Sequence, residues 1–178
     1  MSPAATQAIE GAAPGRPLPV LPTLIVSRDL REGIEQTLRG CGAHGWECVV
    51  FLTAAVAPAD APADAPREVV DFIHPEHGAS RHRYTVPTSE VRRISEELYR
   101  TGRQIVGQAH THPGHAFHSE RDDEGPMVHA PGYVSVVVPW FCRDGLAGLP
   151  DVYVTVYRGG GEWQELPREA ALSTLRVG

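Results

Sequence analysis

The run of residues 46–54 constrains the fold more than any other part of this sequence. It is aromatic and β-branched, it is short, and Glu47 is its only charged residue. These features predict a strand that is buried on both faces in the interior of a sheet. A strand in that position needs other elements of the chain to cover the sheet.

Two amphipathic segments are predicted to supply that cover. Ser27 is a candidate N-cap for a helix over residues 28–39, in which apolar residues recur at helical spacing. A second helix is predicted over residues 88–101, with an apolar stripe and a stop at Gly102. The order of elements predicts an α/β (mixed α+β) fold with a curved mixed β-sheet flanked by helices. The remaining predicted strands are 24–27, 68–73, 82–86, 103–112, 133–138 and 152–157, with 68–73 and 82–86 forming a pair.

The length of 178 residues predicts one domain. We place this domain at residues 23–168, with residues 55–66 as a Pro/Ala/Asp loop insertion. Residues 1–22 are predicted to be a flexible Ala/Pro-rich tail, because they lack the basic start and apolar run of a signal peptide. Residues 169–178 are predicted to be a C-terminal tail.

Charge and cysteine content narrow the classes of partner. The net charge is −6, and all 16 basic residues are Arg. The chain therefore offers no broad surface to neutralise phosphates, and we expect no nucleic-acid partner. The apolar runs are shorter than the roughly 18 residues of a membrane span, so no membrane association is expected. An odd number of cysteines without Cys-x-x-Cys spacing argues against a disulfide framework and a thiolate zinc site, and favours the reducing cytoplasm. The cysteines are Cys41, Cys48 and Cys142.

Histidines concentrate in one short segment after the predicted strand 103–112. His110 and His112 are two residues apart, so both side chains point to the same face of that strand. Pro113 ends the strand, and Asp122 follows across a loop that is long enough to fold back. Two histidines and one carboxylate leave the fourth tetrahedral position of zinc open for water, as in hydrolytic sites. The segment predicts one Zn²⁺ per chain, against the alternative that a His-rich loop binds metals adventitiously.

This segment resembles the JAMM motif of the MPN+ (JAB/Mov34/PAD-1) zinc metalloproteases. That motif has an upstream Glu, then His-[Ser/Thr]-His-Pro, a short loop and Ser-x-x-Asp. The chain has His110-Thr111-His112-Pro113 and Ser119-Glu120-Arg121-Asp122, with the intervening loop one residue shorter than is usual in the family. The resemblance implies the MPN/JAB (cytidine-deaminase-like) architecture and a prokaryotic stand-alone member.

The resemblance also assigns roles to two further residues. A glutamate on an early central strand is expected, and Glu47 in the run 46–54 meets that requirement. Glu47 would take a proton from the attacking water and pass it to the leaving amine, whereas Ser119 would donate a hydrogen bond to the oxyanion. The alternative for Glu47 is an exposed position at the start of the strand. The roles of His115 and His118 stay open between the rim of the cleft and a second metal site.

The resemblance implies a zinc-dependent metallopeptidase. Its substrate would be a peptide or isopeptide bond after the C-terminal glycine of a ubiquitin-like or sulfur-carrier protein. Activating or conjugating enzymes of the same modifier system are further expected partners. Two alternatives are a non-catalytic MPN-like scaffold and a cupin-type metal oxygenase. A cupin site needs a Glu soon after the second His, which this segment lacks before Glu120, and a scaffold typically loses the ligands.

Overall fold

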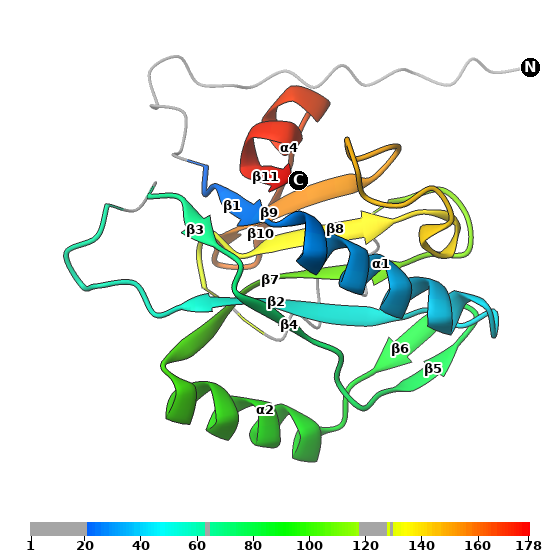
Figure 1. Cartoon of the computed structure of the whole chain (residues 1–178), viewed down its shortest axis with the longest axis horizontal. Coiled ribbons are helices and arrows are strands. Elements are labelled where there is room, and N and C mark those ends of the chain that lie inside the picture. The colour runs from blue at the N-terminus through cyan, green and yellow to red at the C-terminus, as the bar shows by residue number, and fades with distance from the viewer. Residues whose placement is uncertain (1–20, 63–64, 118–127, 129) are drawn as a thin grey trace, which may run out of the picture.

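A computed structural model describes residues 21–62, 65–117, 128 and 130–178. It confirms the predicted fold class, a mixed β-sheet flanked by helices (Figure 1). Within the central sheet β7 and β8 are parallel, and the other neighbouring strands are antiparallel. In spatial order the six strands are β10 (Glu162–Glu165), β9 (Tyr153–Gly159), β8 (Val134–Val138), β7 (Arg103–Thr111), β2 (Val49–Ala55) and β4 (Asp71–Ile73).

Strand β2 lies between β7 and β4, and all of its residues except the last are buried. This agrees with a strand in the sheet interior. The strand starts three residues later than predicted, at Val49. Before it, Cys48 is still hydrogen-bonded to Thr111 of β7, whereas the Glu47 N–H donates a hydrogen bond to the Ser80 carbonyl, 2.8 Å away. Trp46 is about half exposed, at 48%.

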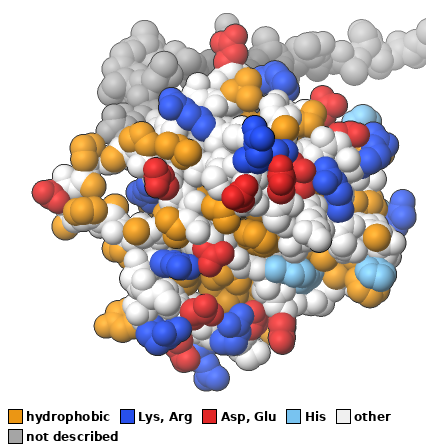
Figure 2. Space-filling view, in the orientation of Figure 1, with side chains coloured by type: hydrophobic (Ala, Val, Ile, Leu, Met, Phe, Trp, Pro, Cys, Tyr) orange, Lys and Arg blue, Asp and Glu red, His pale blue; other side chains and the backbone are white. Residues whose placement is uncertain are grey.

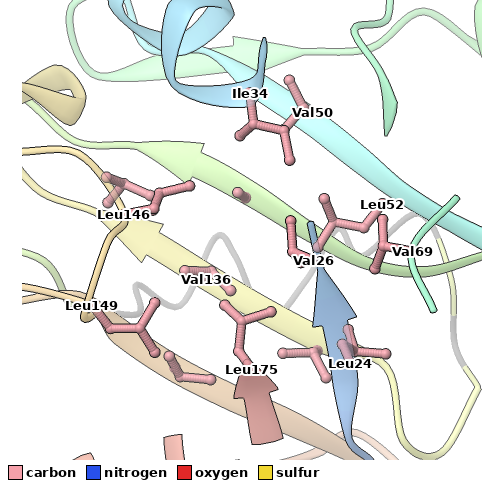
Figure 3. Packing of buried hydrophobic residues seen from close by; sticks show 14 of the residues in the cluster. Leu24, Val26, Ile34, Val50, Leu52, Val69, Val136, Leu146, Leu149 and Leu175 are labelled. Carbon is pink, nitrogen blue, oxygen red and sulfur yellow. The ribbon is translucent and has the colours of Figure 1, made fainter. Parts of the chain in front are cut away.

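One face of the sheet is covered by helix α1 (Arg28–Gly42), whose Ser27 cap accepts a hydrogen bond from the Leu30 N–H. Ile34 of α1 packs over Val50 of β2 (Figure 3). The same apolar layer includes a small parallel sheet of β11 (Leu175–Val177), β1 (Leu24–Val26) and β3 (Arg67–Glu68). The helix runs three residues past its predicted end because Gly40 and Gly42 continue it.

Helix α2 (Thr88–Thr101) packs against the opposite face, where Ile94 and Leu98 join a second apolar cluster with Phe51. The helix ends where predicted. Gly102 has a φ of 64° and donates its backbone N–H to the last turn, a left-handed conformation that glycine adopts at low cost. Strand β2 is therefore covered on both faces, which explains its uniformly apolar sequence.

The predicted pairing of residues 68–73 with 82–86 is not what the structure shows. The first segment divides between β3, which pairs with β1, and β4, which pairs with β2. A separate hairpin joins β5 (Gly78–Ser80) to β6 (Arg83–Thr85). The local alternation of apolar and polar residues indicated strands here. It could not indicate which strands pair, because the pairing partners come from distant parts of the chain.

The C-terminal residues 169–178, expected as a tail, form structure instead. Helix α4 (Arg168–Thr174) buries Ala171, and Leu175 of β11 is 3% exposed. Strand β11 pairs in parallel with β1. The C-terminus is therefore part of the core that α1 covers.

Two other predicted segments fall partly or wholly outside the described residues. The predicted tail 1–22 is described only from residue 21, and the loop 55–66 lacks residues 63–64. The described loop residues after Ala55 are mostly exposed.

On the face drawn in Figure 2, Arg and acidic side chains are interspersed. No helix in the described part of the chain is long and apolar enough to cross a bilayer.

Candidate metal centre

The candidate site lies where β7 ends, beside the start of β2 and the β5–β6 hairpin (Figure 1). His110 is fully buried and His112 is 7% exposed. Their ring centroids are 5.2 Å apart, in keeping with two side chains on the same face of one strand. The two imidazoles are thus close enough to share one ion, as their spacing predicted.

The cross-strand register brings Glu47 to the same place. Val49 pairs with His110, and the next pair along is tied by a hydrogen bond of 2.9 Å from the Thr111 N–H to the Cys48 carbonyl. The pairing of β2 with β7 begins at Val49, and the Glu47 N–H bonds to Ser80 of the β5–β6 hairpin. Glu47 lies two residues before Val49, so the alternation of a strand would direct its side chain to the same face as His110. Glu47 is 7% exposed, so it does not occupy the exposed strand start that was the alternative.

Thr111, between the two histidines, points to the other face and fixes the strand ends together. Its Oγ1 accepts a hydrogen bond of 3.0 Å from the Cys48 N–H. This pair holds β2 and β7 in register at the point where both Glu47 and the histidines emerge. A rigid strand end is a precise support for ligand side chains.

The chain that leaves β7 is held by a strained turn, η1 (Trp140–Cys142). Its three residues have φ values of 54°, 53° and 63° although none is glycine, a conformation that costs about 1–3 kcal/mol per residue. The Phe141 N–H donates to the His112 carbonyl and the Trp140 N–H donates to the Gly114 carbonyl, both at 3.0 Å. The turn therefore fixes the first residues of the loop that follows His112.

Gly42 explains how this turn approaches helix α1. A Cβ at position 42 would lie 2.4 Å from the Cβ of Phe141, which is closer than two carbon atoms can pack. Glycine at the end of α1 therefore leaves the space that the turn beside His112 occupies.

Aromatic rings surround the two histidines. Tyr84 of β6 lies 5.7 Å from His110, and Phe117 lies 4.9 Å from His112, between ring centroids. His115 is exposed and packs 5.0 Å from the Trp140 ring. The other predicted residues of the site, Ser119 and Asp122, lie outside the described residues, as does His118.

The described residues therefore supply two imidazoles and one buried carboxylate at a single strand end. Two neutral imidazoles and a nearby carboxylate are a donor set that zinc accepts. His110 and His112 lie close enough to be two of the three predicted ligands of one ion. The third predicted ligand, Asp122, lies outside the described residues.

A second group of ligand-type side chains was missed by the sequence reasoning. One ligand atom from each member lies within 4.8 Å of those of the others, an arrangement that could hold a metal ion. Its members are Cys41, Cys48, His74 and His77. The expectation that argued against disulfides was wrong, because Cys41 and Cys48 are bonded as a disulfide. The signal available in the sequence was the His-x-x-His spacing of the two histidines.

Within the cluster Cys48 is buried, Cys41 and His77 are half-buried and His74 is exposed. Partial desolvation of the His74 imidazole, followed by the nearby His77, lowers the pKa of His74 below its usual value. Cys142 is a free, buried thiol outside the cluster, and burial raises its pKa to about 11. A thiol with that pKa is a poor nucleophile near neutral pH.

Comparison with known proteins finds similarity both in sequence and in fold. No protein-family model matches the chain. A segment of 84 residues is 36% identical to a protein named "Probable metalloprotease y4jG" from Sinorhizobium fredii. The match spans 46% of this chain and only 50% of that relative's length.

A solved structure shares the fold across most of the chain. The solution structure of protein DSY2949 from Desulfitobacterium hafniense superposes with a TM-score of 0.61, covering 88% of this chain and 93% of that one. The sequence identity is 13%, so this likeness shows the fold alone.

Proposed function

We propose that this chain is a zinc metallopeptidase of the JAMM type. The observation that supports the proposal is the close pair of buried imidazoles, His110 and His112, at the sheet end where the buried Glu47 precedes β2. Two neighbouring buried imidazoles with an acidic residue at the same end of the sheet are suited to metal-assisted hydrolysis.

The relative from Sinorhizobium fredii supports the reaction class, since it is named as a probable metalloprotease. Because the match covers half of that protein, the activity of the whole relative is carried over here only as part of the proposal. The motif residues supply the finer assignment to the JAMM type.

In this proposal His110, His112 and Asp122 hold one Zn²⁺. The ion would act as a Lewis acid that polarises the scissile carbonyl and lowers the pKa of water to about 7. Glu47 accepts the proton of the attacking water and delivers it to the leaving amine. Ser119 donates a hydrogen bond to the developing oxyanion.

The proposed substrate is a peptide or isopeptide bond after the C-terminal glycine of a ubiquitin-like or sulfur-carrier protein. Activating and conjugating enzymes of that modifier system are the proposed partners. Phe117 is 55% exposed and packs on His112, so apolar surface for an extended substrate tail borders the site. A glycine at the end of that tail would let its backbone approach the buried histidines closely.

The decisive variant is Glu47→Gln, which keeps the shape of the side chain but removes its ability to accept a proton. Cleavage of a ubiquitin-like or sulfur-carrier fusion should fall by roughly 100-fold to 10,000-fold, the usual loss for a general base. Zinc content, measured by elemental analysis, should stay at the wild-type level. Asp122→Ala should lose zinc and activity together.

The matched control is Glu68→Gln, which makes the same chemical change at an exposed position in β3. It should leave cleavage and zinc content unchanged. Wild-type rates in Glu47→Gln combined with loss of activity in Asp122→Ala would keep the metal site but remove Glu47 from the mechanism, and Glu120 would then be tested.

A further inference from the structure

The cluster of two cysteines and two histidines is assembled at one edge of the central sheet. Cys41 lies near the end of α1, and Cys48 directly precedes β2. His74 directly follows the edge strand β4, and His77 precedes β5. The pairing of β4 with β2 brings the histidine turn beside Cys48, and the short connection from α1 to β2 brings Cys41.

The distances in this cluster match tetrahedral coordination. With zinc bonds of about 2.3 Å to sulfur and 2.0–2.1 Å to nitrogen, a tetrahedral ion holds a sulfur and a nitrogen about 3.6 Å apart. The Nε2 of His74 lies 3.4 Å from the Cys48 Sγ and 3.7 Å from the Cys41 Sγ. The His74 and His77 ring centroids are 5.0 Å apart. The two sulfurs, which are bonded to each other in this structure, would have to separate after reduction to take two positions around an ion.

His77 is oriented as a metal ligand. Its Nδ1 lies 2.9 Å from the Pro75 carbonyl oxygen, which can only accept, so Nδ1 carries the proton. With the Nδ1 proton donated to this carbonyl, Nε2 is the ring nitrogen available to a metal ion, and ligand histidines are commonly held in this way by a carbonyl. The Nε2 is buried and has no hydrogen-bond partner among the described residues. A buried ring nitrogen of this kind is unfavourable unless something binds it.

The turn that carries the two histidines is held in place from outside the cluster. The Glu76 N–H donates a hydrogen bond of 3.1 Å to the Glu90 carboxylate of α2. Arg93 donates two hydrogen bonds of 2.7 Å to the same carboxylate. Glu90 is itself 5% exposed. The histidines are thus supported by a charged pair on a helix, as a preorganised site requires.

We propose that Cys41, Cys48, His74 and His77 form a second metal site, which binds one zinc-type divalent cation when the two cysteines are reduced. Two cysteines and two histidines fill all four positions of a tetrahedral ion, so this site would be structural and closed to substrate. It is distinct from the proposed hydrolytic site, which uses no sulfur.

The disulfide and the metal-bound form exclude each other. A cellular dithiol can supply two electrons and two protons, which break the Cys41–Cys48 bond and leave two thiols, while the dithiol becomes a disulfide. Binding of the cation then releases the two thiol protons, because the ligands are thiolates. Oxidation of the pair expels the ion. The site would therefore load only in a reducing environment.

Cobalt(II) tests this site without interference from the other one. The full chain is reduced with a dithiol, freed of reductant under argon and titrated with Co²⁺. Thiolate-to-cobalt charge-transfer absorption in the near ultraviolet should rise to one equivalent and be bleached by Zn²⁺. The oxidised protein should show none. Absence of this absorption in the reduced wild type would overturn the proposal.

Variants then distinguish the proposed ligands from residues that do not bind the ion. His77→Gln and His74→Asn should each weaken Co²⁺ binding at least tenfold, and Cys41→Ser should abolish the charge-transfer absorption. The matched controls are His82→Gln, an exposed histidine between β5 and β6, and Cys142→Ala, the remaining thiol. If either histidine variant bound Co²⁺ as tightly as His82→Gln, or if the absorption was lost in Cys142→Ala, the assignment would be wrong.

Discussion

The two groups of ligand-type side chains in this molecule are built in different ways. The proposed hydrolytic site takes His110 from β7, His112 from the residue after that strand, and Glu47 from just before β2. The second group, here called the edge cluster, consists of Cys41, Cys48, His74 and His77. These residues come from four places along the chain: the end of α1, the residue before β2 and the two ends of the β4–β5 turn. The histidines of the proposed hydrolytic site can be recognised in the sequence from their two-residue spacing. The edge cluster cannot be recognised in this way, because its residues come together only when β4 pairs with β2.

The chemistry of the two groups differs as well. Histidines with a carboxylate leave a zinc position open, which suits a reaction. Two thiolates and two imidazoles close the coordination sphere, which suits a structural role. The groups are nevertheless neighbours, because Tyr84 packs against both His77 and His110 at ring-centroid distances of 6.5 and 5.7 Å.

The largest expected effect on hydrolysis and zinc content comes from removing the two histidines of the proposed hydrolytic site while leaving the edge cluster intact. His110→Ala combined with His112→Ala should abolish peptide hydrolysis and lower bound zinc by one equivalent. In the reduced protein one equivalent should remain, held by the edge cluster, and in the oxidised protein none. Elemental analysis of both redox states, together with the cleavage assay, measures this.

The reciprocal change is Cys41→Ser combined with Cys48→Ser. That protein should keep one zinc equivalent in either redox state and should keep its hydrolytic activity. For the variant His110→Ala with His112→Ala, a zinc content equal to that of the wild type would contradict the account. The zinc ion would then be bound elsewhere, and the two groups would not be separate metal sites.

A smaller effect is expected at Gly42, which lies beside Cys41 and against the turn that fixes the residues after His112. In Gly42→Ala the new Cβ would meet the Phe141 Cβ, and overpacking of this kind typically costs about 1–3 kcal/mol of stability. Denaturant unfolding should show that loss. Hydrolysis should also decline, because the displaced turn donates the hydrogen bond to the His112 carbonyl.

Gly40→Ala is the control on the same helix. Nothing lies within 4 Å of a Cβ at position 40, so alanine there should stabilise the helix by roughly 0.5–1 kcal/mol. Equal effects of the two substitutions would show that the contact between α1 and the turn is not tight.

The features that the sequence predicted well depend on the spacing of residues that are close together in the chain. The buried run in β2, the Ser27 cap and the Gly102 stop follow from neighbouring residues. The pairing of His110 with His112 follows from the two-residue repeat of a strand. Placing Glu47 beside them needed the family resemblance, because an antiparallel register cannot be read from one strand.

The features that the sequence did not reveal depend on distant contacts. Residues 169–178 were expected to be a tail because they are few and terminal, yet β11 finds its partner in β1, at the other end of the described chain. The division of residues 68–73 between two sheets has the same cause. The cysteines looked passive because Cys41 and Cys48 lack a close motif spacing, and His74 approaches them only through the β2–β4 pairing.

The most direct test of the central claim is an anomalous difference map at the zinc edge from crystals of the full chain grown with zinc. The account predicts a peak at the end of β7, about 2.0–2.1 Å from a ring nitrogen of each of His110 and His112, with the Glu47 carboxylate facing it. Reduced crystals should show a second peak among the edge cysteines and histidines. A map with no peak between His110 and His112, or with Glu47 turned away from it, would contradict the proposed hydrolytic site.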